Sequence, residues 1–422
     1  MKASAPRPLF LHSAAQLLTL AGPPVPRRGL ALAELGIIRE GAVLTHRGQI
    51  LRIGTTRQLA REARSLKSRA IDCGGRVVMP GFVDSHIHLV FAGNRVDDFE
   101  RRVQGASYEE IARSGGGIAH SAKLLRNAAA LDLVAMAGRF LKEFGIHGTT
   151  TVETKTGYGL DVDGELKILE VVRRLREISR LELVPTLLAA HALPEDFEGR
   201  REEFLALVTE TLIPVVARDG LAEFADCFCD SGAFTVEECR RVLKSGIRHG
   251  LVPRIHAEQL SRTGAAQLAV EIGAASADHL DQVRAVDVQA LARSNVVATL
   301  LPGANFHLGL SHYPPARELI ETGAAMALAT DFNPGTSPTL NMQFILSLAC
   351  LQMCMTPAEA ISAATVNAAY SLRRADRLGS LEPGKQADLI VMDVADYREI
   401  PYYFAWNHCV MTVKGGRIIH SK

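Results

Sequence analysis

The sequence predicts an α/β fold, a (β/α)8 TIM barrel with a small β-sandwich domain built from both termini. Three observations lead to this prediction. Short apolar runs alternate with helical stretches through the middle of the chain, as in βα units around a parallel sheet. Most of these runs end in a histidine or an acid, and both ends of the chain carry hairpin patterns instead. With 422 residues, 47% of them hydrophobic, the chain can form one large domain and a minor one.

Eight apolar runs are expected to form the barrel, because a strand buried on both faces is almost continuously apolar. They span residues 77–89, 148–153, 182–191, 221–229, 252–258, 274–280, 295–302 and 325–331. Helices are expected between them where apolar residues recur near helical spacing, as at 163–179, 235–250 and 262–273. The predicted division is residues 1–78 for the first part of the sandwich, 79–375 for the catalytic barrel and 376–422 for the second part.

The terminal segments are expected to form antiparallel sheet. Residues 42–54 contain two alternating apolar runs separated by Arg47-Gly48. An apolar run within residues 380–396 precedes a second hairpin pattern at 409–420, around Gly415-Gly416. The two ends of the chain therefore predict one β-module.

The first 22 residues have the outline of a secretory signal, because Lys2 and Arg7 precede an apolar stretch. His12, Ser13 and Gln16 interrupt that stretch, so we expect an N-terminal strand of the mature protein and a cytoplasmic location. No run of 18 or more uncharged apolar residues occurs elsewhere, so no membrane span is expected.

Composition favours a small-molecule ligand. The formal net charge is +1, from 47 basic and 46 acidic residues, and no basic run with interleaved aromatics is present, so no nucleic-acid partner is expected. Seven cysteines form an odd, sparse set without C-x-x-C pairs, which is typical of reduced cytosolic thiols.

Polar residues that end the predicted strands point to a metal site, because catalytic groups of such barrels lie at the carboxyl ends of the strands. They are His86 and His88 in the first run, Glu153 in the second, His191 in the third, His256 in the fifth, His279 in the sixth and Asp331 in the eighth. Alternation along a strand places His86 and His88 on one face, so both imidazoles can face one ion. With His256 and Asp331 they would supply three neutral nitrogens and a carboxylate to a divalent metal, with room for water.

The bland interpretation is that each histidine is simply hydrogen-bonded structure, since a lone H-x-H pair occurs by chance. Five of the fourteen histidines end predicted barrel strands, however, which favours a shared site. Asp331 ends an uncharged strand, where an unpaired buried carboxylate would be costly, so a cation partner is expected.

These residues resemble the amidohydrolase superfamily, through the strand-1 motif PGFVDSHIH, the single histidines of runs five and six, and the aspartate of run eight. Five further segments are similar to members that hydrolyse a cyclic amide with a propionate tail in histidine degradation. They are residues 91–118, 153–160, 256–261, 276–280 and 329–338, so the resemblance covers roughly residues 80 to 340.

The resemblance implies one zinc or iron ion per subunit, bound by His86, His88, His256 and Asp331, in a homodimer. The absence of a lysine from run four agrees with one ion, because no carboxylated lysine is available to bridge two. His279 and Asp331 would be catalytic. Substrate contacts would come from Arg95, Tyr158, His191, Gln259 and Thr336, and the ring-opened product would be held by Asn333 and Gly335.

Three positions depart from some members of the superfamily. The segment ETKTGYGL has threonine where several members have serine, and Gln259 stands where others place an acid. Thr336 stands where serine also occurs.

The expected chemistry is hydrolysis at a ring carbonyl. A metal polarises the carbonyl and lowers the pKa of its bound water from about 15.7 towards 7. Asp331 and His279 are the candidates for taking and relaying the proton, and the planar fork of Arg95 suits a carboxylate tail.

Two alternatives stay open. A deaminase of a purine- or pyrimidine-like ring would use the same metal set, but such enzymes commonly place a glutamate three residues after the histidine of the fifth strand, where Gln259 has no useful proton to give. A non-catalytic scaffold would keep the barrel, but such members tend to lose metal ligands, and all four candidates are present here.

Overall fold

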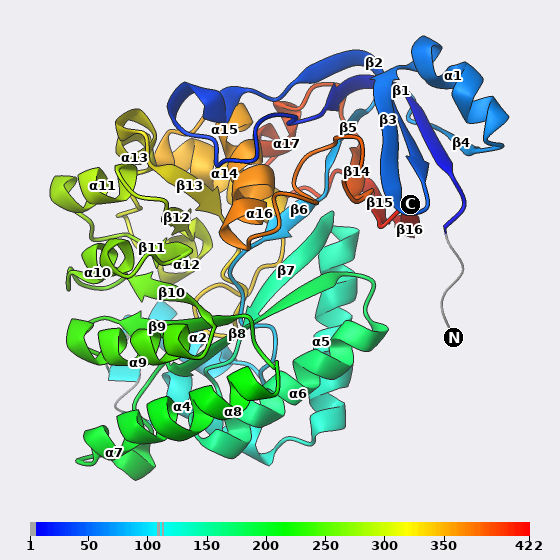
Figure 1. The fold of residues 1–422 in the computed structure, drawn as a ribbon. Coiled ribbons are helices and arrows are strands. Elements are labelled where there is room, and N and C mark those ends of the chain that lie inside the picture. The colour runs from blue at the N-terminus through cyan, green and yellow to red at the C-terminus, as the bar shows by residue number, and fades with distance from the viewer. Residues whose placement is uncertain (1–5, 108–109, 112–113) are drawn as a thin grey trace.

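Two sheets organise the chain in the computed structural model, which describes residues 6–107, 110–111 and 114–422 (Figure 1). One sheet is parallel throughout and has the order β13-β12-β11-β10-β9-β8-β7-β6. Its strands are β6 (Phe82–Asp84), β7 (Thr149–Lys155), β8 (Glu182–Ala190), β9 (Phe224–Cys229), β10 (Val252–Ala257), β11 (Ser276–His279), β12 (Val297–Leu300) and β13 (Ala325–Leu328). These strands fall within or beside the eight predicted runs.

The parallel sheet curls into a nearly closed barrel. Beyond the ends of β6 and β13, Ile87 and Phe332 form an isolated parallel bridge. His88 N donates to Phe332 O at 2.8 Å, and Asp331 N donates to His86 O at 3.0 Å. The predicted (β/α)8 barrel is thus confirmed, and the closing bonds involve the residues predicted to bind a metal.

The first predicted run, 77–89, is wrong as a single strand. It divides at Gly81 into β5 (Val77–Pro80), which belongs to the other sheet, and β6. A Cβ at Gly81 would lie 2.3 Å from Thr150 Cγ2, so only glycine lets the chain pass this close to β7. His86 and His88 consequently lie just beyond the end of β6, in non-strand backbone.

The second sheet contains strands from both ends of the chain, as predicted, in the order β16-β15-β14-β5-β1-β2-β3, with β4 beside β1. They are β1 (Leu9–Leu18), β2 (Ile37–His46), β3 (Gln49–Thr55), β4 (Arg69–Asp72), β14 (Leu389–Met392), β15 (Cys409–Lys414) and β16 (Arg417–Ser421). The predicted N-terminal strand is β1. Buried leucine, isoleucine and valine side chains from both termini pack into one cluster on this sheet.

Both predicted hairpin turns are present, and they touch each other. Arg47 and Gly48 have φ of 51° and 86°, and Gly415 and Gly416 have φ of 55° and 70°, as a tight two-residue turn requires. A Cβ on Gly48 would lie 3.1 Å from Gly415 O. Glycine therefore allows the turns from opposite ends of the chain to pack together.

Most helices surround the barrel, whereas α1 (Thr56–Ser65) packs against β2 and β3 of the second sheet. The three predicted ones are α6 (Val162–Ile178), α9 (Val236–Arg248) and α10 (Ala265–Glu271). Thr235 and Glu238 form a capping box that fixes the start of α9. The others are α1 (Thr56–Ser65), α2 (Val96–Val103), α4 (Gly117–Asn127), α5 (Ala130–Ile146), α7 (Arg201–Ala206), α8 (Ile213–Arg218), α11 (Ala285–Ala292), α12 (Pro302–Leu308), α13 (Ala316–Thr322), α14 (Met342–Met353), α15 (Pro357–Ser362), α16 (Ala368–Ser371) and α17 (Glu399–Tyr402).

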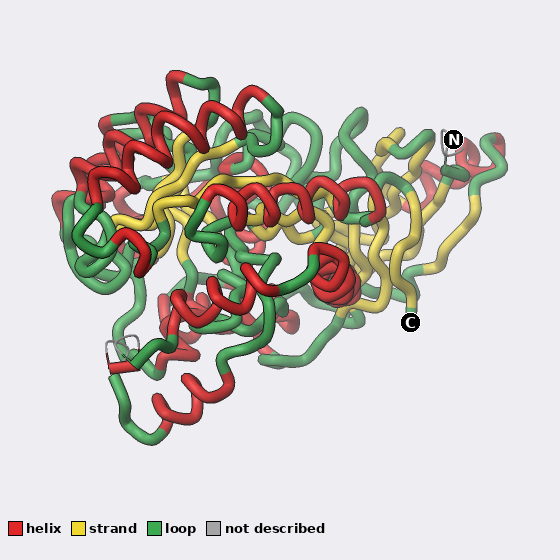
Figure 2. Tube along the Cα trace, turned by 90° about the horizontal axis from the view of Figure 1, so that it is seen from below, coloured by secondary structure: helices red, strands yellow, loops and turns green. Residues whose placement is uncertain are grey.

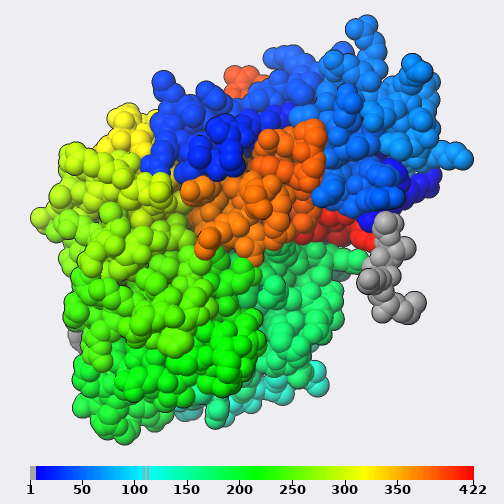
Figure 3. All heavy atoms as spheres, viewed as in Figure 1, coloured from blue at the N-terminus to red at the C-terminus, as the bar shows by residue number. Residues whose placement is uncertain are grey.

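Segments from the two ends of the chain also meet on the barrel. In Figure 2 the barrel strands and the terminal strands form two groups, with the C-terminus beside the terminal group. Figure 3 shows a blue part of the chain, close to the N-terminus in sequence, lying against the orange part that contains α15 and α16. Arg27 N donates to Asn367 Oδ1 at 2.8 Å, and Asn367 Nδ2 donates to Arg27 O at 2.9 Å. In the described part of the chain, no helix has the length and apolar character needed to cross a membrane.

Candidate active site

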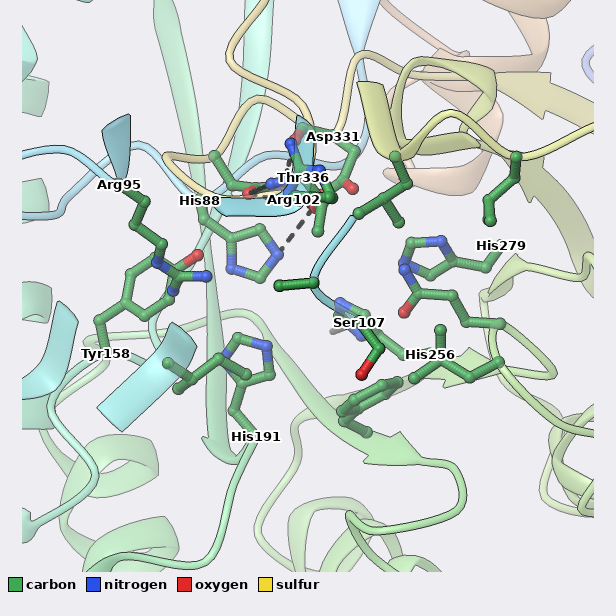
Figure 4. A pocket seen from close by; sticks show the side chains of 18 residues that line it. His88, Arg95, Arg102, Ser107, Tyr158, His191, His256, His279, Asp331 and Thr336 are labelled. Carbon is green, nitrogen blue, oxygen red and sulfur yellow. Dashed lines mark hydrogen bonds and ion pairs between the residues drawn. The ribbon is translucent and has the colours of Figure 1, made fainter. Parts of the chain in front are cut away.

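A cavity of about 280 Å³ opens among the carboxyl ends of the barrel strands and brings most of the predicted site residues together. Those that line it are His88, Arg95, Tyr158, His191, His256, Gln259, His279, Asp331, Asn333 and Thr336. In Figure 4, Arg95 and Tyr158 lie on one side and His279 on the other, with His88 and Asp331 between them. His86 is fully buried behind this surface, and Gly335 packs against Arg95.

His86, His88 and Asp331 converge on one point. Asp331 Oδ1 lies 3.6 Å from His86 Nε2 and 3.7 Å from His88 Nε2. The backbone bonds between the segments after β6 and β13 fix this approach, and all three side chains are buried.

A second group shares His86. Nitrogens of His86, His256 and His279 lie within 4.8 Å of one another, as do the donor atoms of His86, His88 and Asp331. The predicted four-ligand set draws members from both groups.

Burial keeps the imidazoles of His86, His88 and His279 neutral. It lowers the pKa of all three well below the usual value, and the positive charge of Lys155 adds to the effect. Burial raises the pKa of Asp331 well above its usual value, because a carboxylate is costly there unless a cation stabilises it.

The donor set fits a metal ion. Among the described residues, His86 Nε2 and His256 Nε2 are buried and have no hydrogen-bond partner, and the two rings are 4.5 Å apart. Imidazole nitrogens beside a buried carboxylate are the ligands that zinc and iron accept. A bound cation would give the two unpartnered nitrogens a partner and would stabilise the ionised form of Asp331.

Left-handed backbone occurs at three residues around this cluster. Glu258, His279 and Asp331 have φ of 55°, 81° and 53°. Each follows or ends a barrel strand, and such conformations are uncommon for residues with a Cβ. Strain of this kind persists where the surrounding structure holds it and tends to occur at functional sites.

Arg95 lies buried at the start of α2. Its Nε donates to Ser121 Oγ at 2.8 Å, and its guanidinium lies 5.5 Å from the centre of the Tyr158 ring. Its Nη2 is a buried donor without a partner among the described residues. A Cβ on Gly335 would come 2.2 Å from Nη1, so glycine makes room for the guanidinium.

His191 is held in one orientation. Its Nδ1 lies 2.8 Å from Gly157 O, which implies that Nδ1 carries the proton and leaves Nε2 as an acceptor. The ring stacks on His88 at 5.2 Å, and burial lowers the pKa of His191 to about 3.

Asn333 organises the loop after β13. Its Oδ1 accepts from Gly335 N at 2.8 Å and Thr336 N at 2.7 Å, and its Nδ2 donates to Asp331 O at 2.7 Å. The amide thus links the Asp331 backbone to the two residues beside Arg95.

Gln259 and His279 line the opposite part of the cavity. The backbone N of Gln259 donates to Asp230 Oδ2 at 3.0 Å, which fixes the loop after β10. His279 Nδ1 lies 4.0 Å from Asp281 Oδ2. Asn305 Nδ2 donates to Asp281 Oδ1 at 2.6 Å and thereby holds that carboxylate.

Sequence reasoning missed several residues of the cavity, above all Arg102 and Ser107. Arg102 Nη2 donates to His307 O at 3.3 Å, so α2 touches the end of α12. Its neighbour Arg101 instead bonds Ser114 on the exposed side. Nothing in the Arg101-Arg102 pair tells which arginine faces the cavity, because helix phase depends on packing.

Comparison with known proteins finds relatives that match almost the whole chain. A family model described as the amidohydrolase family matches residues 77–419. An imidazolonepropionase of Geobacillus thermodenitrificans is 45% identical over 418 residues, which cover 98% of each chain. Another from Solibacter usitatus is 47% identical over 407 residues, covering 96% of this chain and 97% of the relative.

Solved structures show the same fold at lower identity. A zinc-bound adenosine deaminase from Xanthomonas campestris matches with a TM-score of 0.71 at 18% identity, over 99% of this chain and 94% of that chain. A triazine hydrolase variant matches with a TM-score of 0.75 at 16% identity, over 98% of this chain and 95% of that chain. At such identities the likeness concerns the fold alone.

Proposed function

The chain belongs to the amidohydrolase family, and from this premise we propose how its residues act on their substrate. It is a hydrolase of a carbon–nitrogen bond in a cyclic amide: it converts 4-imidazolone-5-propanoate to N-formimidoyl-L-glutamate in histidine degradation. This activity follows from the imidazolonepropionases that match the chain over nearly its full length.

The observation that carries the proposal is the placement of Arg95. Arg95, whose buried Nη2 has no partner among the described residues, borders the same cavity as the histidine–aspartate cluster, on the side opposite His279 (Figure 4). A substrate with a carboxylate at one end and a ring carbonyl at the other fits this arrangement, because a guanidinium recognises the carboxylate and the cluster receives the ring.

We propose that His86, His88, His256 and Asp331 hold one zinc or iron ion per subunit. The ion would supply polarisation of the ring carbonyl and an acidified water. The two unpartnered Nε2 atoms and the buried Asp331 support this set.

His279 and Asp331 are the proposed proton-transfer groups. His279 is neutral at pH 7, since burial lowers its pKa, and it can accept a proton. Asp281 lies within 4.0 Å of His279 Nδ1, close enough to stabilise the protonated ring.

The remaining contacts follow from the cavity lining. Tyr158 would close over the propionate beside Arg95, and His191 Nε2, Gln259 and Thr336 would contact the ring or the water by hydrogen bonds. Asn333 and Gly335 would hold the ring-opened product through the loop they build beside Arg95.

We also propose a cytoplasmic homodimer without nucleic-acid or membrane partners, and the domain division 1–78, 79–375 and 376–422. The balanced charge supports the absence of a polyanion partner. The separate terminal sheet supports the division, with β5 paired to β14 as far as Pro80.

The test is a side-by-side assay of the purified enzyme. We expect rapid loss of the imidazolone absorbance and no ammonia release from purines or pyrimidines. Gln259 argues against the deaminase, because an amide cannot protonate a ring. Ammonia release without imidazolone turnover would reverse the assignment.

A further inference from the structure

Charged side chains fill the barrel interior behind the proposed metal ligands. Glu153, Lys155, Asp226, Arg254 and Asp278 are all buried, at 1% exposure or less. They come from strands β7, β9, β10 and β11 of the barrel. Buried charges at this density are costly unless each is paired, so their arrangement needs an explanation.

Two of the carboxylates contact proposed ligands. Asp278 Oδ2 lies 2.7 Å from His86 Nδ1, and Asp226 Oδ1 lies 3.2 Å from His256 Nδ1. A carboxylate beside Nδ1 fixes the proton on that nitrogen and leaves Nε2 as the free lone pair. These are the same two histidines whose Nε2 atoms lack a partner.

Lys155 joins the two carboxylates. Its Nζ lies 2.7 Å from Asp226 Oδ2, 2.8 Å from Glu153 Oε1 and 3.5 Å from Asp278 Oδ2. In the described part of the chain, Lys155 is the only lysine or arginine paired with Asp226, whereas Asp278 also has Arg254 at 3.4 Å. The His256 side of the network thus depends most on Lys155.

The hydrogen-bond geometry shows Asp226 as an acceptor. Its Oδ2 accepts from Lys155 Nζ at 2.7 Å, and its Oδ1 accepts from Cys227 N at 2.7 Å. The same Oδ1 faces His256 Nδ1. Lys155 therefore holds one oxygen of Asp226 while the other faces the imidazole.

We infer that Lys155 is a positioning residue for the metal centre. It holds Asp226 so that His256 keeps its proton on Nδ1 and presents Nε2 to the ion. The inference rests on the proposed ligand set. Lys155 is not one of the proposed ligands and does not line the cavity. Its role goes beyond neutralising buried charge, because by holding one carboxylate oxygen of Asp226 it keeps the other oxygen directed at the imidazole.

The first experiment compares two buried lysines. Lys155→Met should weaken Zn²⁺ binding roughly ten-fold or more, measured by competition with a chelator, since removing outer partners of metal-binding histidines has effects of about 10–100-fold. Lys414→Met is the matched control: Lys414 is also buried and lies 2.7 Å from Asp388, but in the terminal sheet. It should lose stability and keep wild-type Zn²⁺ affinity.

A rescue experiment separates positioning from simple charge balance. In the wild type, Cys227 N donates to Asp226 Oδ1 at 2.7 Å. The ammonium group of Lys155 can only donate hydrogen bonds, so in Asp226→Asn the amide oxygen must face Lys155. The amide NH₂ must then face His256 Nδ1 and Cys227 N. That orientation favours a proton on His256 Nε2 and should weaken Zn²⁺ binding. Adding Lys155→Met frees the amide to turn, so the charge-balanced double variant should bind Zn²⁺ more tightly than Asp226→Asn.

Nitrogen-15 NMR of the metal-free protein gives the independent readout. Wild type and the double variant should carry the His256 proton on Nδ1, and Asp226→Asn should carry it on Nε2. A double variant that binds Zn²⁺ no better than Asp226→Asn, with no change of tautomer, overturns the inference, even if Lys155→Met alone does not fold. His256→Ala tells the two proposals apart: if it keeps wild-type Zn²⁺ affinity, the ligand set itself fails and the inference with it.

Discussion

At the scale of single residues, Arg95 is the group that ties the substrate tail to the cavity. It is buried, its Nε is bonded to Ser121 Oγ, and its Nη2 is unpartnered among the described residues. Arg95→Ala should lower kcat/KM by roughly ten- to 150-fold, because a charge-assisted hydrogen bond to a carboxylate contributes about 1.5–3 kcal/mol. Arg95→Lys should be impaired less, since it keeps the charge but loses the fork.

The measurement is kcat/KM for the propionate substrate and for an analogue without the carboxylate. Wild type should discriminate strongly between them and Arg95→Ala barely at all. Unchanged discrimination in the alanine variant would place the tail site elsewhere.

Gly335 should influence binding of the substrate's carboxylate tail through its contact with Arg95. An added Cβ would meet the guanidinium, which is the mobile end of a side chain, so Gly335→Ala should move Arg95 at little cost in stability. We expect a higher KM for the propionate substrate with metal content unchanged. Gly138→Ala is the matched control, because a Cβ there meets nothing within 4 Å. Equal kinetics of the two variants would contradict this coupling.

Asp281 gives a pH-dependent prediction. Burial raises its pKa to about 7, from 3.8 for the unfolded chain. Between these values the folded state keeps a proton that the unfolded state releases, so this group's contribution to stability is lost as pH rises through the window. The side chain in Asp281→Asn cannot ionise. The free energy of unfolding of this variant, relative to wild type, should therefore rise by up to about 1.4 kcal/mol for each pH unit across this window. Urea unfolding at pH 5 and pH 8 measures this gain, and a difference that does not vary with pH would disprove it.

At the scale of elements, the paired turns of β2–β3 and β15–β16 join the two ends of the chain. Gly415 has φ of +55° and open space around its missing Cβ, whereas Gly48 has φ of +86° and Gly415 O at 3.1 Å. Gly415→Ala should therefore lose only the left-handed backbone preference, about 1–2 kcal/mol. Gly48→Ala should lose about 1–3 kcal/mol more, because the Cβ also presses on fixed backbone.

Urea unfolding of both variants tests this difference, with kcat/KM as the control. Activity should stay at the wild-type value, since both turns lie in the terminal sheet. Equal losses of unfolding free energy would mean that the two turns do not constrain each other.

At the scale of the whole molecule, metal binding should be linked to folding. An ion that binds only the native state stabilises it by about 2.7 kcal/mol when its free concentration is 100-fold above the dissociation constant. Removing the ion with a chelator should lower Tm and abolish activity, and added zinc should restore both. Zinc should not raise the Tm of His86→Ala.

His249→Ala is the matched control for this prediction. His249 lies at the end of α9, where its Nδ1 contacts Ser245 O at 2.9 Å, and it does not line the cavity. Its variant should keep the full response to zinc. A His86→Ala variant that still gains stability from zinc would exclude His86 as a ligand.

Part of this protein could be predicted from sequence because the relevant signals are local. A parallel strand buried on both faces must be apolar throughout, so the eight runs gave the barrel strands. Tight turns need positive φ, so Arg47-Gly48 and Gly415-Gly416 marked the hairpins. Histidine and aspartate at strand ends carry the metal chemistry in their residue type, so the candidate ligands were readable as well.

Other features were decided by the tertiary structure, because they depend on which side chains meet across distant strands. The approach of Thr150 to Gly81 divides the first run between two sheets. Packing of α2 turns Arg102, rather than Arg101, to the cavity. Asp226 and Asp278 lie 71 and 123 residues after Lys155 in the sequence. Lys155 contacts both only because β7, β9 and β11 converge in the barrel. Sequence thus determined the fold class and the chemistry at hand, and burial in a shared interior determined which charges pair and which histidine nitrogens remain free.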